Sequence, residues 1–148
     1  MICIFFGHKD TPYEVKEKLR ETIVNLIEKQ EVTNFYVGNH GNFDRMVLSV
    51  LKELSKLYPQ IRYSVVLAYL TQHDEEDFSN TVYPEGIESV PKRFAIDFRN
   101  KWMVQQADIV VAYVRRFIGG AAKFTEMAKS GKRKLSIYKL KGYAVVIA

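Results

Sequence analysis

The sequence predicts a three-layer α/β/α fold with a mainly parallel sheet of about five strands, because short apolar runs alternate with amphipathic helix patterns along most of the chain. Apolar residues make up 47% of the 148 residues, enough to bury one core, and this length suits a single domain spanning residues 1–148. Strands that alternate with helices form βαβ units with right-handed crossovers, so the expected fold is Rossmann-like.

The first half of the chain contains three predicted strands and two predicted helices. Short apolar runs at residues 2–6 and 35–37 predict strands that end at glycine. Apolar residues recur at helical spacing over residues 15–30 and again over 46–57. The almost unbroken apolar run at 63–70 is typical of a parallel strand covered on both faces, which places it at the sheet centre.

A long polar insert at about residues 71–93 separates the two halves and is the candidate lid of a site. The elements predicted after it are a helix at 94–107, a strand at 109–114, a helix at 121–130, a strand at 135–138 and an edge strand at 143–147.

Composition narrows the classes of partner. The net charge of +5 is a mild excess of positive charge, which is compatible with binding a nucleotide phosphate as well as a nucleic acid. We expect a nucleotide-derived small molecule as the partner and regard a nucleic acid as unlikely. Cys3 is the single cysteine, which excludes an intrachain disulfide and fits a reducing, cytoplasmic setting. No apolar run is long enough to span a membrane, so no membrane partner is expected.

The loops after the first four strands should meet at one edge of the sheet, because ligands of open α/β sheets bind outside the carboxyl ends of the strands. Those loops begin near residues 7, 38, 71 and 115. The candidate ligand-binding residues on or beside them are Gly7, His8, Lys9, Gly38, Asn39, His40, Gly41, Asp44, Gly119, Gly120, Ala121 and Lys123.

Gly119 and Gly120 stand between a buried-strand pattern and a helix pattern that carries Glu126. Such a loop lets a phosphate approach the free N–H groups of the helix start, although a glycine pair can also be a plain turn. The spacing matches neither a Walker loop nor the usual dinucleotide fingerprint.

Three other polar features have two interpretations each. Asp44 could cap the helix that follows it, or accept a hydrogen bond from a ribose or base. His8, with Gly7 and Lys9, could contact a ligand or form an exposed turn. Arg99, near the start of a predicted helix, could donate two hydrogen bonds to a phosphate or bind a carboxylate. Its neighbours Trp102 and Met103 are more typical of core residues.

Metal and cofactor chemistry is not expected. The three histidines, at positions 8, 40 and 73, lie on three separate predicted loops without helical pairing and without a cysteine partner. We therefore predict no metal site and no cofactor. The sequence also has no Gly-x-Ser-x-Gly elbow that would indicate a serine nucleophile.

The residues resemble the SLOG superfamily, nucleotide-binding Rossmann-like proteins that include the Smf/DprA proteins and the Lonely Guy phosphoribohydrolases. Phe6-Gly7-His8-Lys9 resembles the Gly-His-Arg opening of one branch, and residues 38–44 resemble its glycine-rich segment ending in Gly-Phe-Asp. Residues 99–103, with Gly119, Gly120 and Glu126, resemble its second half, so the likeness follows most of the chain in order.

The Lonely Guy enzymes share an Arg-x-x-x-Met element and a Pro-Gly-Gly-x-Gly-Thr-x-x-Glu loop. Arg99 and Met103 match the first, and Gly119, Gly120 and Glu126 match the second, which differs here at Ile118, Ala122 and Lys123. In that family the arginine and the final glutamate are implicated in cleaving the N-glycosidic bond of a nucleoside 5′-monophosphate. The resemblance therefore implies Glu126 and Arg99 as catalytic residues if the chain is an enzyme.

Three functions remain open at the level of the sequence. The first is a SLOG-type sensor or binding protein for a phosphorylated nucleoside or nucleotide-derived ligand. The second is a nucleoside 5′-monophosphate phosphoribohydrolase that uses Glu126 and Arg99. The third is an Smf/DprA-like nucleic-acid-binding protein, suggested by the basic residues at 129 and 132–134, although such a cluster is more often a solvated helix end whose cations suit the dipole. The 13% aromatic content and the resemblance favour a homo-oligomer, most simply a dimer.

Overall fold

The structure is a computed structural model that describes residues 1–68, 80–115, 120–130, 136–141 and 144–147. Its sheet has the strand order β4-β3-β2-β1-β5-β6-β7, in which the first six strands in chain order run parallel and β7 runs antiparallel to β6. The strands are β1 (Ile2–Gly7), β2 (Asn34–Val37), β3 (Arg62–Val66), β4 (Thr81–Val82), β5 (Ile109–Tyr113), β6 (Ser136–Lys141) and β7 (Ala144–Ile147).

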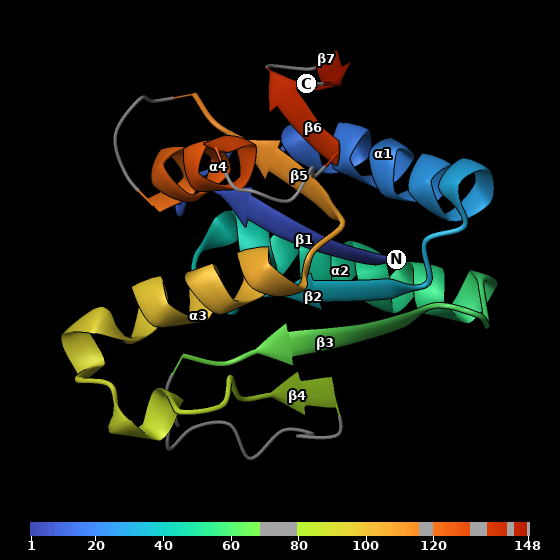
Figure 1. Ribbon diagram of the computed structural model, residues 1–148. Coiled ribbons are helices and arrows are strands. Elements are labelled where there is room, and N and C mark those ends of the chain that lie inside the picture. The colour runs from blue at the N-terminus through green and yellow to red at the C-terminus, as the bar shows by residue number, and fades with distance from the viewer. Residues whose placement is uncertain (69–79, 116–119, 131–135, 142–143, 148) are drawn as a thin grey trace.

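Helices cover both faces of this sheet (Figure 1). One core cluster joins the sheet to α1 (Val15–Gln30) and α2 (Asn42–Leu57), and another joins it to α3 (Lys92–Gln106) and α4 (Gly120–Ser130). The predicted three-layer, Rossmann-like fold with a mainly parallel sheet is thus confirmed. The sheet has seven described strands instead of about five, because β4 and the edge strand β7 extend it.

The strand order places a topological switch beside β1, the central strand. β1 pairs with β2 on one side and with β5 on the other, so the chain winds outward in opposite directions from the β1/β5 pair. Cys3, Ile4 and Phe5 are almost completely buried there. In sheets of this kind the loops that leave the carboxyl ends on either side of the switch enclose a crevice.

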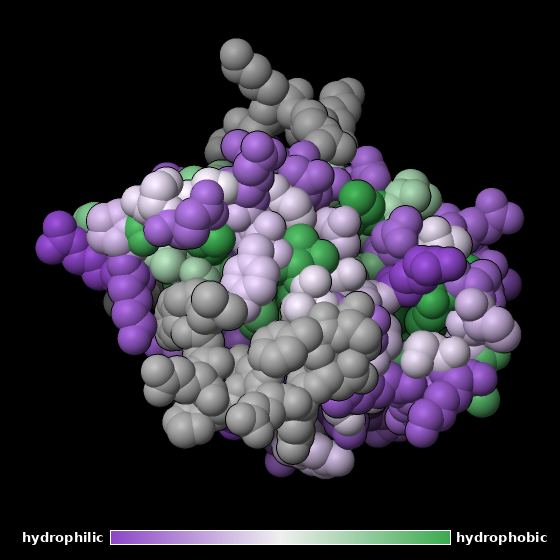
Figure 2. Space-filling view, turned by 90° about the horizontal axis from the view of Figure 1, so that it is seen from below, coloured by the Kyte–Doolittle hydropathy of each residue, from purple (hydrophilic) through white to green (hydrophobic). Residues whose placement is uncertain are grey.

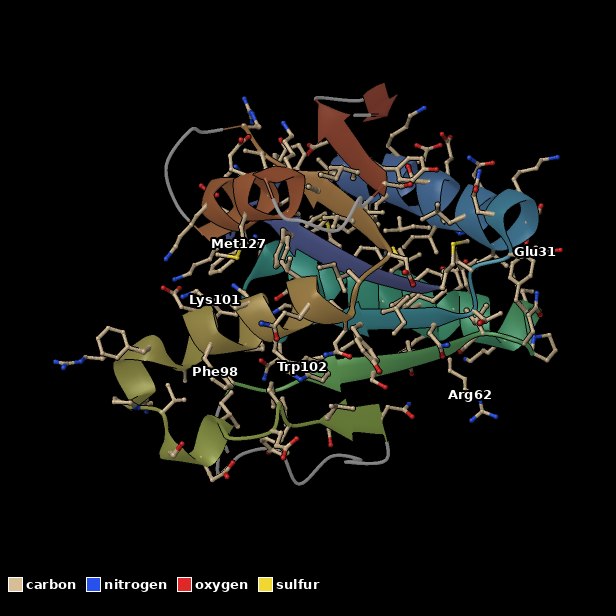
Figure 3. All side chains as sticks on the ribbon, in the orientation of Figure 1. Glu31, Arg62, Phe98, Lys101, Trp102 and Met127 are labelled. Carbon is tan, nitrogen blue, oxygen red and sulfur yellow. The ribbon has the colours of Figure 1, made fainter. Side chains whose placement is uncertain are left out.

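The prediction that the apolar run at 63–70 lies at the sheet centre is wrong. β3 ends at Val66 and is second from the edge, paired with β2 and with the two-residue strand β4. Arg62 is exposed and points away from the sheet in Figure 3, and only Val66 of this strand is buried. Strand pairing decides position in a sheet, and an apolar run does not encode which strand it pairs with.

The polar insert predicted at 71–93 contains regular structure in its described part. Residues 69–79 lie outside the described residues. After them come β4, the short 3-10 helix η2 (Ile87–Ser89), and α3, which begins at Lys92 directly after Pro91. Phe98, on the side of α3 that faces β4 in Figure 3, packs in a small cluster with Ile87.

The face seen in Figure 2 shows hydrophobic residues only in small areas between hydrophilic ones. None of the described helices is long and apolar enough to cross a membrane.

Candidate functional site

The loop between β2 and α2 is where groups from the two helical layers meet. α2 supplies Asp44 from one face of the sheet, and α3 supplies Arg99 from the other. Both reach Gly38: a Cβ built on this glycine would lie 2.8 Å from Asp44 Oδ2 and 2.9 Å from Arg99 Cζ. Gly38 is therefore needed because its missing side chain leaves room for a carboxylate and a guanidinium over the end of β2.

Arg99 is a buried cation, only 3% exposed. Its Nε donates to Asn100 Oδ1 at 3.1 Å, and its Nη1 donates to Asn39 Oδ1 at 3.3 Å. These two amide oxygens orient the planar guanidinium group of Arg99 toward the β2–α2 loop. The residue lies in the middle of α3 and not near its start, because the helix begins two residues earlier than the sequence predicted.

Asp44 is buried in the first turn of α2, where its Oδ2 accepts the backbone N–H of His40 at 2.9 Å. Burial raises the pKa of this carboxyl from 3.8 to about 6, against the opposing effects of the His40 hydrogen bond and the nearby Arg99 charge. The bond reaches back to His40, which precedes the helix, and α2 has no side-chain cap hydrogen bond at Gly41, so Asp44 is not the N-cap of α2, although an acid in the first turn suits the helix dipole. A carboxyl whose pKa is raised this far is also typical of functional sites.

Replacing Asp44 with asparagine is expected to stabilise the protein at neutral pH. The native carboxyl keeps its proton up to about pH 6, whereas the unfolded chain releases it near pH 3.8, so the native state binds more protons between these values. Stability should therefore fall as pH rises through this window, by at most about 3 kcal/mol, and stay flat above it. Asp44→Asn keeps an oxygen that accepts the His40 N–H, and above pH 6 its free energy of unfolding should exceed that of the wild type by about 1–3 kcal/mol.

Urea unfolding of both proteins from about pH 4 to about pH 7 measures this effect. Asp97→Asn, which removes a carboxyl exposed on α3 and paired with Lys123 on the surface, is the control for the loss of one negative charge and should change stability by no more than about 1 kcal/mol. A lower stability of Asp44→Asn than of the wild type at pH 7 would show that the buried charge is well compensated.

Two further glycines of the predicted site serve contacts within the protein. A Cβ on Gly7 would overlap the ring of Phe43, which is almost fully buried in the first turn of α2. Gly41 has φ 92°, and a Cβ there would lie 2.6 Å from Lys9 Cα. The loops after β1 and β2 therefore pack directly on one another, and Asn42 N–H donates to Lys9 O at 2.8 Å.

His8 connects the two strands of the switch. Its Nε2 accepts the backbone N–H of Arg115, which follows β5, at 2.8 Å, and its ring packs edge-on against Tyr113 at 6.0 Å between centroids. Because Nε2 is an acceptor, the imidazole carries no proton on that nitrogen. His8 is buried, so it is not the exposed turn residue of the alternative interpretation.

His40 has a polar atom without a protein partner. Among the described residues none hydrogen-bonds its Nε2, although this atom is buried. Burial lowers the pKa of His40, and the charges of Lys9, Arg99 and Arg45 lower it further, so the ring tends to be neutral. A buried ring nitrogen normally has a hydrogen-bond partner, and a ligand or a water could supply one.

The α4 side of the predicted site is less enclosed. Lys123 Nζ bonds Asp97 Oδ2 at 2.8 Å across the surface between α4 and α3. Glu126, with a side chain 72% exposed, pairs with Lys129 at 3.4 Å, while Arg99 is buried. Gly119 lies outside the described residues, and Gly120 and Ala121 are the first residues of α4.

The structure thus groups the predicted residues from the first two loops with Arg99, and leaves Lys123 and Glu126 in exposed surface pairs. Sequence reasoning missed Asn100, which orients Arg99, and Arg115, which binds His8 through its backbone. Neither contact has a sequence signal, since one is a local side-chain choice and the other joins residues 107 positions apart. Met103 is buried and Trp102 stacks on Tyr36 at 5.6 Å, as expected for core residues.

Within the described parts of the chain, no three His, Cys, Asp or Glu side chains come close enough to hold a metal ion, and His73 lies outside those parts. A scan against models of known protein families finds no match to this sequence, and no curated protein is similar to it at a significant level.

Proposed function

We propose that the chain binds a phosphorylated nucleoside, or another ligand derived from a nucleotide, at the carboxyl edge of the sheet. The observation that carries the proposal is the meeting of Arg99 and Asp44 over Gly38, directly after β2, the strand that pairs with β1 at the switch. A buried guanidinium is suited to a phosphate or another planar anion. A buried carboxyl beside it can hydrogen-bond ribose hydroxyls or a base edge.

The two loops are built to hold this arrangement in place. The bond between Asn42 and Lys9 and the close contacts at Gly7 and Gly41 fix the loops after β1 and β2 against each other. A preformed site loses little conformational entropy on binding. The buried Nε2 of His40 offers one more hydrogen-bonding position, for a group such as a sugar hydroxyl.

Binding without cleavage is the favoured form of the proposal. A phosphoribohydrolase needs its carboxylate beside the sugar in a site shielded from water. Glu126 is exposed and paired with Lys129, which favours a solvated surface role for it. The basic cluster behind the nucleic-acid alternative gives no support either, because Lys129 pairs with Glu126 and residues 132–134 lie outside the described residues.

Thermal shift and mass spectrometry test the proposal, with nucleoside monophosphates, cyclic nucleotides, ADP-ribose and NAD as probes and with free base monitored in the same samples. We expect a rise in unfolding temperature with at least one probe and no base release. Base release that Glu126→Gln abolishes would establish the hydrolase instead. A chain that no probe stabilises would contradict both.

A further inference from the structure

A cationic groove runs along the outer surface of α2, beside the start of α1, on the face of the sheet opposite α3. Two adjoining hollows of about 350 Å³ and 460 Å³ share Arg45 and Ser49 and form it: the smaller lies between the start of α1 and α2, and residues of α2 alone line the larger. We call it the α1–α2 groove, and the residues that define it are Tyr13, Lys16, Arg45, Ser49, Lys52 and Lys56.

The charge of this groove is strongly one-sided. Among the described residues that line the two hollows, Glu53 is the one acid, and its carboxylate is already bonded to Arg20 of α1 at 3.2 Å. Lys52 and Lys56 are four residues apart on the same side of α2, a spacing at which like charges destabilise a helix. A solvated helix face normally mixes both signs, so this arrangement points to an anionic partner.

The groove also has apolar surface. Tyr13 at one end is 73% exposed, and Lys16 Nζ lies 5.5 Å from its ring centroid. The half-buried Leu48 and the buried Met46 contribute to the floor. Exposed tyrosines and arginines are the residues most often found at the energetic centre of protein interfaces.

We propose that the α1–α2 groove docks an acidic segment of a partner protein, with Asp and Glu side chains on its cations and an apolar side chain against Tyr13. A peptide is favoured over a nucleic acid because the groove combines its cations with the apolar surface of Leu48 and Met46, which an apolar side chain of a peptide can cover. Tyr13 is the single exposed aromatic ring among the described residues that line the groove, whereas a single-stranded nucleic acid normally stacks its bases on several such rings.

The experiment measures fluorescence anisotropy of a labelled short peptide rich in Glu and Asp with a central Trp, titrated with the full chain at low salt. The test variant is Lys52→Glu/Lys56→Glu. The matched control is Lys18→Glu/Lys29→Glu, which makes the same change in net charge on α1 outside the groove. We expect the test variant to lose about tenfold or more in affinity and the control to stay within about threefold.

A second variant keeps the result interpretable if charge reversal disturbs folding. Tyr13→Ser removes the exposed ring without changing charge and should weaken peptide binding several-fold while leaving the unfolding temperature unchanged. Equal losses in the test and control variants, or no peptide binding at all, would overturn the proposal. Tighter binding of a labelled oligothymidylate than of the peptide would also overturn it. So would a dimer, seen by light scattering, that the Lys52→Glu/Lys56→Glu change converts to a monomer.

Discussion

Replacing Gly7 with alanine is expected to destabilise the protein by about 3 kcal/mol, at the upper end of the usual cost of overpacking. The new Cβ would overlap the Phe43 ring and lie 2.6 Å from Phe43 Cβ. Rotating the ring cannot relieve the second contact, because Phe43 Cβ is fixed to the backbone of α2. The start of this helix, with Asp44 beside Phe43, would have to move away from the end of β1.

A double-mutant cycle with Phe43→Ala tests this explanation by urea unfolding. Phe43→Ala alone should cost about 3–5 kcal/mol, since the ring is buried and stacked on Tyr113. In the double variant the overlap with the ring is gone, but the contact with Cβ of residue 43 stays because alanine keeps that atom, so the alanine at position 7 should cost only part of its single-variant value, which gives a coupling energy of about 1–2 kcal/mol. Gly86→Ala is the matched control: its φ is 86° and the nearest atom to a new Cβ is 3.9 Å away, so only the backbone strain of about 1 kcal/mol applies. Additive effects at positions 7 and 43 would contradict the explanation.

Replacing Arg99 with methionine is expected to weaken binding of a nucleotide by about ten- to a hundredfold, the value of one or two charge-assisted hydrogen bonds. Methionine keeps much of the buried volume but loses the guanidinium that faces Gly38. The Arg99 charge also lowers the pKa of Asp44, so its removal should raise that pKa further. Binding should then depend on pH over a range shifted upward from about pH 6.

Calorimetric titration of the wild type and the variant with the same nucleotide, at two pH values, measures both effects. Lys101→Met is the matched control, because it removes one exposed positive charge from the same helix away from Gly38. It should leave the affinity within about twofold. An Arg99→Met protein that is folded and binds as tightly as the wild type would exclude a role for the guanidinium in binding.

Much of the architecture follows from local patterns. The apolar spacing after Val15 predicted α1 with the observed end at Gln30, because one face of that helix packs on the sheet along its whole length. The edge position of β7 also followed from its place at the end of the series. The position of β3 did not, since strand order is a property of pairing between distant segments.

In the candidate site, too, some features could be predicted from the sequence and others could not. Position along the chain was enough to place Gly38 and Asp44 at the carboxyl edge, because every parallel strand ends there. The reasons for the glycines were different from those expected: Gly7 and Gly41 make room for Phe43 and Lys9, which lie more than 30 residues away from them in the sequence. Such close contacts depend on how two loops pack, and no single-sequence pattern encodes them. The burial of Arg99 likewise depends on which face of α3 meets the sheet.

Chemical-shift mapping by NMR, with 5′-AMP and ADP-ribose added in turn to the labelled protein, tests whether a nucleotide binds at the carboxyl edge of the sheet. We expect the largest amide shifts at His8, Gly38, His40, Asp44 and Arg115, around the Arg99 guanidinium, and only small shifts at residues of the α1–α2 groove. Saturable shifts confined to another surface, or none with either probe, would contradict a nucleotide site at this edge of the sheet.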